Sequence, residues 1–117
     1  MARQGLPRSR RLRSRKDFVR VQRTGHRRTS RYFVALVSEP HAPTASGENR
    51  VGLTVSRKVG GAVARNRVKR RIRELWRARP SATPVRDVVI IARRGAAELS
   101  SAEAAASLSA VLEEAGR

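Results

Sequence analysis

The side chains that most often transfer protons or hold metal ions are few in this chain, which has nine Asp and Glu residues, two histidines and no cysteine. The carboxylates are scattered, and no DxD or ExK cluster could gather a metal pair for phosphoryl transfer. His26 and His41 fall in expected loops, where a lone histidine is more often an ordinary exposed side chain than a proton-transfer group. Gly60-Gly61 indicates a turn, because no GxxxxGK[ST] or GxGxxG loop surrounds it. The sequence therefore predicts no catalytic residue and no metal site in the chain itself.

The basic side chains could instead bind a phosphate backbone. Lys and Arg number 27, so the formal net charge is +18. Residues 65–79 contain eight of these cations and a single acid, Glu74, and residues 1–31 contain twelve with one acid. A solvated charged face is the usual alternative, but like-charge repulsion in so dense a run costs stability unless an anion is bound. We expect nucleic-acid binding centred on 65–79, and charge alone leaves RNA and DNA both open.

Three further side chains bear on how a nucleic acid would be contacted. Asn66 lies between two arginines and offers a planar amide that can hydrogen-bond to bases or sugars. Trp76 falls on the apolar side of its segment, so we expect it in the core. Phe18 could stack on a base or pack within the fold, and the sequence favours neither.

Six elements would position these residues. A helix is predicted over 14–24, where Ser14 is a good N-cap and Gly25 the stop, and a second over 62–78. A third helix begins at the capping box Ser100 to Glu103. Strands are expected over 32–38, 50–56 and 87–93, and the last has an unbroken apolar run typical of burial on both faces.

Two of these elements have clearly different sides. The helix over 62–78 has an apolar side and an opposite side that is mostly cationic. The apolar side carries Ala64, Val68, Ile72, Leu75 and Trp76, and the opposite side carries Asn66, Lys69, Arg70, Arg73 and Arg77. The strand over 50–56 alternates. Val51, Leu53 and Val55 should enter the core, whereas Gly52, Thr54 and Ser56 form a flat polar face that simple solvent exposure would also explain.

The order of these elements indicates one two-layer α+β domain over residues 12–117, with helices packed on a small sheet. Residues 1–11 are Arg-rich and without a period, so we expect a flexible basic arm. The longest apolar run is far too short to cross a bilayer and no export signal follows the amino terminus, so a cytoplasmic protein without membrane partners is expected.

The sequence resembles the protein subunit of bacterial ribonuclease P over nearly the whole chain except the arm and the 39–49 loop. The resemblance rests on 50–58, on Gly60-Gly61 with Ala62 and Val63, on the Arg65-Asn66-Arg67 helix through Glu74, on Asp17-Phe18 and on 87–93. It implies the order αβββαβα, a mixed sheet and a left-handed βαβ crossover of the kind found in ribosomal proteins. One departure is visible, since relatives often have a second aromatic residue where this chain has Gln22.

The resemblance also implies a function. In that family a large catalytic RNA removes the 5′ leader of precursor tRNA with Mg²⁺ held mainly by RNA, and the protein assists without supplying the catalytic centre. Contacts to the catalytic RNA would come from Arg65, Asn66, Arg67, Lys69, Arg70 and Arg73. Contacts to the precursor leader would come from Phe18, Gln22, Thr54, Ser56 and Lys58. The alternative from the residues alone is a ribosomal or other structural RNA-binding protein, and a DNA-compacting protein is a third possibility. The oligomeric state is left open.

Overall fold

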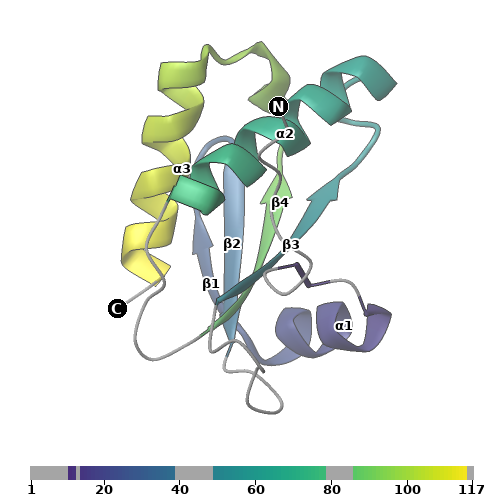
Figure 1. Ribbon diagram of the computed structural model, residues 1–117, viewed down its shortest axis with the longest axis vertical. Coiled ribbons are helices and arrows are strands. Elements are labelled where there is room, and N and C mark those ends of the chain that lie inside the picture. Colours follow the sequence, from purple (N-terminus) through teal and green to yellow (C-terminus); the bar gives the residue numbers. More distant parts are fainter. Residues whose placement is uncertain (1–10, 13, 39–48, 79–85, 116–117) are drawn as a thin grey trace, which may run out of the picture.

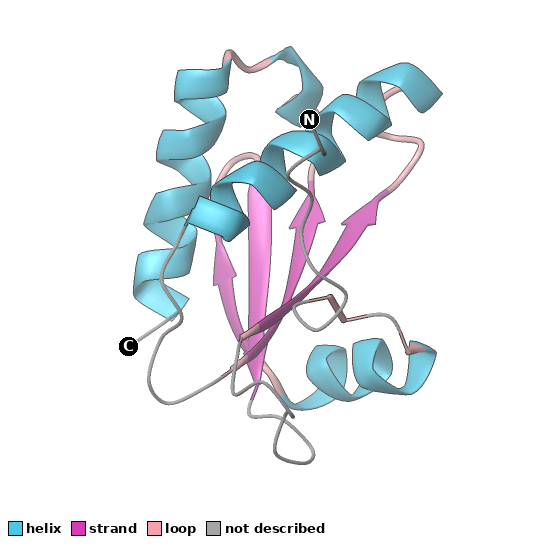
Figure 2. Ribbon diagram, viewed as in Figure 1, coloured by secondary structure: helices cyan, strands magenta, loops and turns pink. Residues whose placement is uncertain are grey.

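The computed structural model describes residues 11–12, 14–38, 49–78 and 86–115, without the side chains of 113–115. Its elements are α1 (Arg15–Thr24), β1 (His26–Thr29), β2 (Phe33–Ser38), β3 (Arg50–Val55), α2 (Ala62–Ala78), β4 (Asp87–Ala92), the short 3₁₀ helix η2 (Ala96–Glu98) and α3 (Ser101–Ala115). Figures 1 and 2 show them arranged around one sheet. The order αβββαβα is confirmed, with η2 as an added turn before α3.

The four strands form one mixed sheet in the order β1-β2-β4-β3. The β1–β2 and β2–β4 pairs are antiparallel, whereas β3 and β4 are parallel, with Leu53 opposite Ile90. Both parallel strands point up in Figure 1, α2 lies in front of the sheet and β4 stands to the left of β3. The crossover from β3 through α2 to β4 is therefore left-handed, against the usual preference for the right-handed form.

The sheet is covered on both faces, which is why its central strands are apolar throughout. On one face, α2 and α3 contribute Ile72, Trp76 and Leu108 to the larger core cluster, together with Val51 and Ile90 from the strands. On the other face a smaller cluster joins Leu12 and Val21 to Val34, Leu36 and Val89. The burial of 87–92 on both faces is confirmed, and Trp76 is a core residue as expected.

One strand was not predicted from the local sequence pattern, although the resemblance implied a third strand before α2. His26 was expected in a loop but begins β1, whose four residues are all exposed. A strand with no buried side chain shows no apolar alternation, and it forms because its backbone pairs with β2, His26 opposite Val37. The other histidine, His41, lies outside the described residues.

The ends of the predicted elements agree with the structure to within about one residue, the usual uncertainty of helix and strand limits. Ser14 caps α1 through the Lys16 amide, and Gly25 ends it by donating to the Val21 carbonyl. The predicted arm lies outside the described residues except for Arg11, which forms a parallel bridge with Val51, while the Leu12 amide donates to the Val51 carbonyl. In the described part of the chain, no helix combines the length and apolarity needed to cross a membrane.

Candidate nucleic-acid interface

The basic helix α2 packs one side against the sheet and presents the other outward. Val68, Ile72 and Trp76 are buried, which fixes the rotation of the helix and confirms the predicted apolar side. The outward side exposes Asn66 and Arg70, with Lys69 half-buried beside them. The six residues predicted to contact a catalytic RNA thus share one helix, where Arg65 and Arg73 are also half-buried and Arg67 is exposed.

Two arginines of α2 are engaged with the backbone that follows β4. The Arg67 guanidinium donates to the Ala97 carbonyl at 3.2 Å, and Arg71 donates to the Leu99 carbonyl at 2.6 Å. Arg71 therefore anchors α2 to the η2 segment, although the sequence offered it as one more cation of the run. Among the described residues, the charged partner of Arg70 is Glu74 at 3.8 Å, and both side chains are more than half exposed, so this pair restrains Arg70 weakly.

On the opposite face of the sheet, the ring of Phe18 lies on Gly52. A Cβ atom built at Gly52 would lie 2.7 Å from Cε1 of the ring, so only glycine lets the aromatic side chain settle on β3. Phe18 is half-buried and packs against the smaller core cluster. Phe18 therefore packs within the fold and still exposes part of its ring.

The rest of the predicted leader-binding set extends from this contact along β3. Thr54 is half-buried and pairs with Ile91 of β4, which is also half-buried. Ser56 and Lys58 are exposed in the turn after β3, where the Ser56 hydroxyl accepts from the Lys58 amide. Gln22, one turn beyond Phe18 on α1, is exposed. The flat polar face predicted for β3 is thus covered by Phe18 at Gly52 and more open beyond it.

An ion-pair network joins α1 to the start of β3 and β4. Asp87 is fully buried and accepts two hydrogen bonds from Arg50, from Nε to Oδ1 at 2.9 Å and from a terminal nitrogen to Oδ2 at 2.7 Å. Arg20 of α1 reaches the same Oδ2 at 2.6 Å. Asp17 adds a second carboxylate, 3.3 Å from Arg20 and 3.7 Å from Arg50. We call these four side chains the Asp87 network.

The network is electrically balanced, because it contains two carboxylates and two guanidiniums. The hydrogen bonds to Asp87 raise the pKa of Arg50, which burial partly opposes, so its positive charge is held firmly. A chain of net charge +18 therefore has a neutral region next to the Phe18–Gly52 contact. This agrees with the polar, uncharged side chains that the sequence places at Thr54 and Ser56 on the same face of β3.

The sequence did not reveal the Asp87 network. Its one signal was an acidic residue at the head of a strand expected to be buried on both faces, because a buried carboxylate requires a charged or hydrogen-bonding partner. Nothing in the sequence identified that partner as Arg20, 67 positions away. The sequence likewise showed Gly52 only as one of several small residues, and nothing in it indicated that an aromatic ring packs there.

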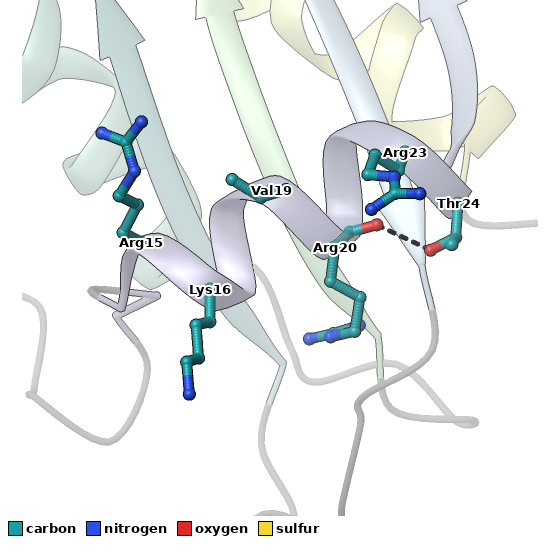
Figure 3. Close-up of a pocket in the computed structure, with 6 residues that line it drawn as sticks. All are labelled: Arg15, Lys16, Val19, Arg20, Arg23 and Thr24. Carbon is teal, nitrogen blue, oxygen red and sulfur yellow. Dashed lines mark hydrogen bonds between the residues drawn. The ribbon is translucent and has the colours of Figure 1, made fainter.

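A hollow of about 540 Å³ lies beside α1, and no residue of β3 is among its lining residues. Figure 3 shows its lining side chains extending from the helix, with the Thr24 hydroxyl donating to the Arg20 carbonyl. The lining residues are Arg15, Lys16, Val19, Arg20, Arg23 and Thr24. Phe18 and Gln22 are not among them, so the hollow is no part of the predicted leader-binding set.

Within the described ranges, no group of three or more His, Cys, Asp or Glu side chains could hold a metal ion. The four side chains of the Asp87 network pair with one another, and each carboxylate faces guanidinium groups. The carboxylates of Asp17 and Asp87 are therefore engaged by guanidinium groups.

Comparison with known proteins gives one consistent result. The family model described as Ribonuclease P matches residues 6–116. A protein of Streptomyces avermitilis named ribonuclease P protein component is 41% identical over 115 residues, covering 92% of this chain and 93% of its own length. One of the same name from Desulforapulum autotrophicum is 39% identical over 99 residues, covering 84% and 81%.

Solved structures agree in shape. The RNase P protein of Staphylococcus aureus superposes with a TM-score of 0.81 at 31% identity, covering 92% of this chain and 98% of that one. The RNase P protein of Thermotoga maritima gives a TM-score of 0.74 at 29% identity, covering 89% and 96%. Both the sequence and the arrangement of the elements are therefore shared.

Proposed function

The chain belongs to the ribonuclease P protein family, and on that premise we propose that it serves as the protein component of a ribonuclease P ribonucleoprotein, which matures the 5′ end of tRNA. Its partner is then the RNA of that enzyme. The observation that supports this role best is the division of the molecule into two surfaces. The cationic side of α2 suits a folded polyanion, and the nearly neutral β3 face beside Phe18 suits exposed bases.

The assignment of each surface follows the chemistry of its side chains. We place the catalytic RNA on α2, where Arg65, Asn66, Lys69, Arg70 and Arg73 contribute fixed cations and one amide. Such contacts with phosphates position an RNA whatever its sequence. Arg67 would share its guanidinium between RNA and the Ala97 carbonyl.

The single-stranded 5′ leader of the precursor is placed on the β3 face. Phe18 offers a ring for stacking, and Thr54 and Ser56 offer hydroxyl groups that can hydrogen-bond to bases or sugars. Lys58 in the following turn would meet a leader phosphate. Gln22 takes the place of a second aromatic side chain. This chain would therefore hold the leader by stacking one base on Phe18 and by hydrogen bonds from the Gln22 amide.

Catalysis would belong to the RNA, with Mg²⁺ ions held mainly by RNA. The protein would assist by adding cations to a polyanionic assembly, which lowers the concentration of Mg²⁺ needed to neutralise it. The scattered carboxylates of the sequence, and the pairing of Asp17 and Asp87 with guanidinium groups, support this division of labour. In such an enzyme the chain is a subunit of an endoribonuclease and contributes binding instead of bond cleavage.

Reconstitution with the catalytic RNA tests the proposal. Cleavage of precursor tRNA is measured over a range of Mg²⁺ concentrations with RNA alone and with the protein added. The proposal expects the protein to shift half-maximal cleavage to lower Mg²⁺, and to raise affinity for precursor over mature tRNA. A ribosomal role would instead give co-sedimentation with ribosomes and no preference for leader-bearing tRNA. No gain over RNA alone rejects the proposal.

A further inference from the structure

The attachment of α1 to the sheet depends unusually little on apolar contacts. Val21 is the only fully buried residue of this helix, and Phe18 is only half-buried. A ten-residue helix with so thin an apolar side is held weakly by hydrophobic burial alone. Another restraint must therefore fix where α1 lies on the sheet.

The Asp87 network supplies that restraint. The link from Arg20 to the buried Asp87 is charge-assisted and short, at 2.6 Å, and Arg50 orients the same carboxylate from β3. Buried carboxylates with several such bonds have one geometry, so they resist sliding of the helix in a way that apolar packing does not. Because Arg20 is two residues after Phe18, fixing Arg20 also fixes where the ring can rest.

The network and the ring are also adjacent on the strand. Arg50, Gly52 and Thr54 alternate along β3, so they face the same side of the sheet. Arg50 holds Asp87, Gly52 receives the Phe18 ring, and Thr54 begins the more open part of the face. A shift of α1 by one residue along this row would move the ring away from Gly52, the position that lacks a Cβ atom.

We infer that Arg20, Arg50 and Asp87 are positioning residues for the precursor leader: they hold α1 so that Phe18 lies on Gly52 and presents its ring to a single-stranded RNA. This inference rests on the proposed function of the β3 face. It assigns to Arg20 an effect on leader affinity without any contact with RNA. In a chain with 27 basic residues, a simple count of cations would place Arg20 among the phosphate contacts.

The test compares Arg20→Gln with Arg20→Lys in the reconstituted holoenzyme. Glutamine removes the positive charge that pairs with Asp87, whereas lysine keeps a positive charge at this position. For Arg20→Gln we expect the affinity for leader-bearing precursor to fall at least about fivefold, the effect of losing one base–aromatic stack. Affinity for the same tRNA without a leader, and for the catalytic RNA, should change less than about twofold. Arg20→Lys should retain most of the leader affinity.

A measurement on the free protein separates positioning from direct contact. The Cα hydrogen of Gly52 that takes the place of a Cβ atom points at the Cζ end of the Phe18 ring, so the ring current should shift its NMR resonance. Arg20→Gln should reduce this shift without RNA present, and Arg20→Lys should preserve it. A role limited to phosphate contact would leave the shift unchanged.

The outcomes distinguish the inference from the proposed function. If the parent holoenzyme shows no leader-dependent affinity, the proposed function of the β3 face fails. If the parent shows it and Arg20→Gln keeps both the leader affinity and the Gly52 shift, the positioning role is wrong. Equal losses of affinity for leader-bearing and leaderless tRNA would likewise overturn it, because they indicate general loss of structure.

Discussion

The ring of Phe18 covers Gly52, which leaves no room there for even a methyl group. This contact brings together a helix and a strand that are far apart in sequence. Gly52 lies on the polar face of the strand, and the aromatic side chain packs directly on it. It also sets the height of the ring above the sheet, because a backbone without Cβ allows the closest approach.

Replacing Gly52 should therefore displace the ring. We expect Gly52→Ala to lower the free energy of unfolding by about 1–3 kcal/mol, the usual cost of overpacking, and to reduce affinity for leader-bearing precursor more than for leaderless tRNA. Urea unfolding and binding titrations check the two effects. Gly61→Ala is the matched control for stability, because a Cβ atom there meets nothing within 4 Å. Equal unfolding curves for Gly52→Ala and the parent would contradict the prediction.

Neighbouring arginines of α2 should differ in what they contribute. Arg70→Ala removes an outward cation, so it should weaken binding of the catalytic RNA and lower the slope of log affinity against log salt by about one, with little change in stability. Arg71→Ala removes the bond to the Leu99 carbonyl and should cost about 1 kcal/mol of unfolding free energy. The salt dependence of RNA binding and the thermal unfolding are measured for both variants. If the two variants lose the same affinity and the same stability, the two arginines do not differ in role.

The buried carboxylate of the Asp87 network should matter more than the exposed one. Asp87→Asn leaves Arg20 and Arg50 facing a neutral amide, so we expect a loss of about 2–3 kcal/mol, below the value for fully buried pairs because both guanidiniums retain some contact with water. Asp17→Asn serves as control, since its contacts are longer and it is 24% exposed, with a loss under about 1 kcal/mol. Chemical unfolding measures both. Similar losses of unfolding free energy for the two variants would show that burial does not determine how much each carboxylate contributes to stability.

The capping box of α3 should make stability depend on pH. The Glu103 carboxylate accepts from the Ser100 amide at 2.9 Å, and hydrogen bonds from Ser100 lower the pKa of Glu103 below its ordinary value of 4.5. A lowered pKa in the folded state means that the carboxylate stabilises the fold above pH 4.5 and that this contribution is lost as the pH falls through the folded pKa.

The comparison with Glu103→Gln isolates that contribution. At neutral pH the parent should be the more stable protein, and the two unfolding curves should approach each other as the pH is lowered below 4.5. Thermal unfolding at several pH values provides the test. A constant difference between parent and variant across this range would show that the ionised form of Glu103 has no special role.

The sequence predicted the local structure of the chain better than its long-range contacts. Capping residues such as Ser14 and Ser100, the stop at Gly25 and the alternation along β3 act within a few positions, so their effects are visible in the sequence. β1 was missed because a strand whose side chains are all exposed owes its existence to pairing with β2.

In the candidate site, too, local features were predictable from the sequence and long-range contacts were not. The cationic side of α2 follows from helical spacing, which is why Asn66 and Arg70 were correctly expected to face outward. The engagement of Arg71 with the Leu99 carbonyl and of Arg20 with Asp87 depends on how distant elements meet, and no local pattern encodes it. Asp17 shows the limit most clearly, because it lies three residues after the N-cap Ser14, which is the spacing of a capping box, and yet its carboxylate faces Arg20 and Arg50.

The exposed strand β1 has a consequence for how separate molecules behave before they meet RNA. Its backbone forms one edge of the sheet, and an unprotected edge can recruit the strand of a second molecule and begin aggregation. Arg27 and Arg28 are exposed on this edge strand, so two approaching copies would bring like charges together. At the opposite edge, the Leu12 amide already occupies the Val51 carbonyl of β3. The charge along β1 thus disfavours edge-to-edge pairing between two copies of the chain, apart from any contact that α2 makes with RNA.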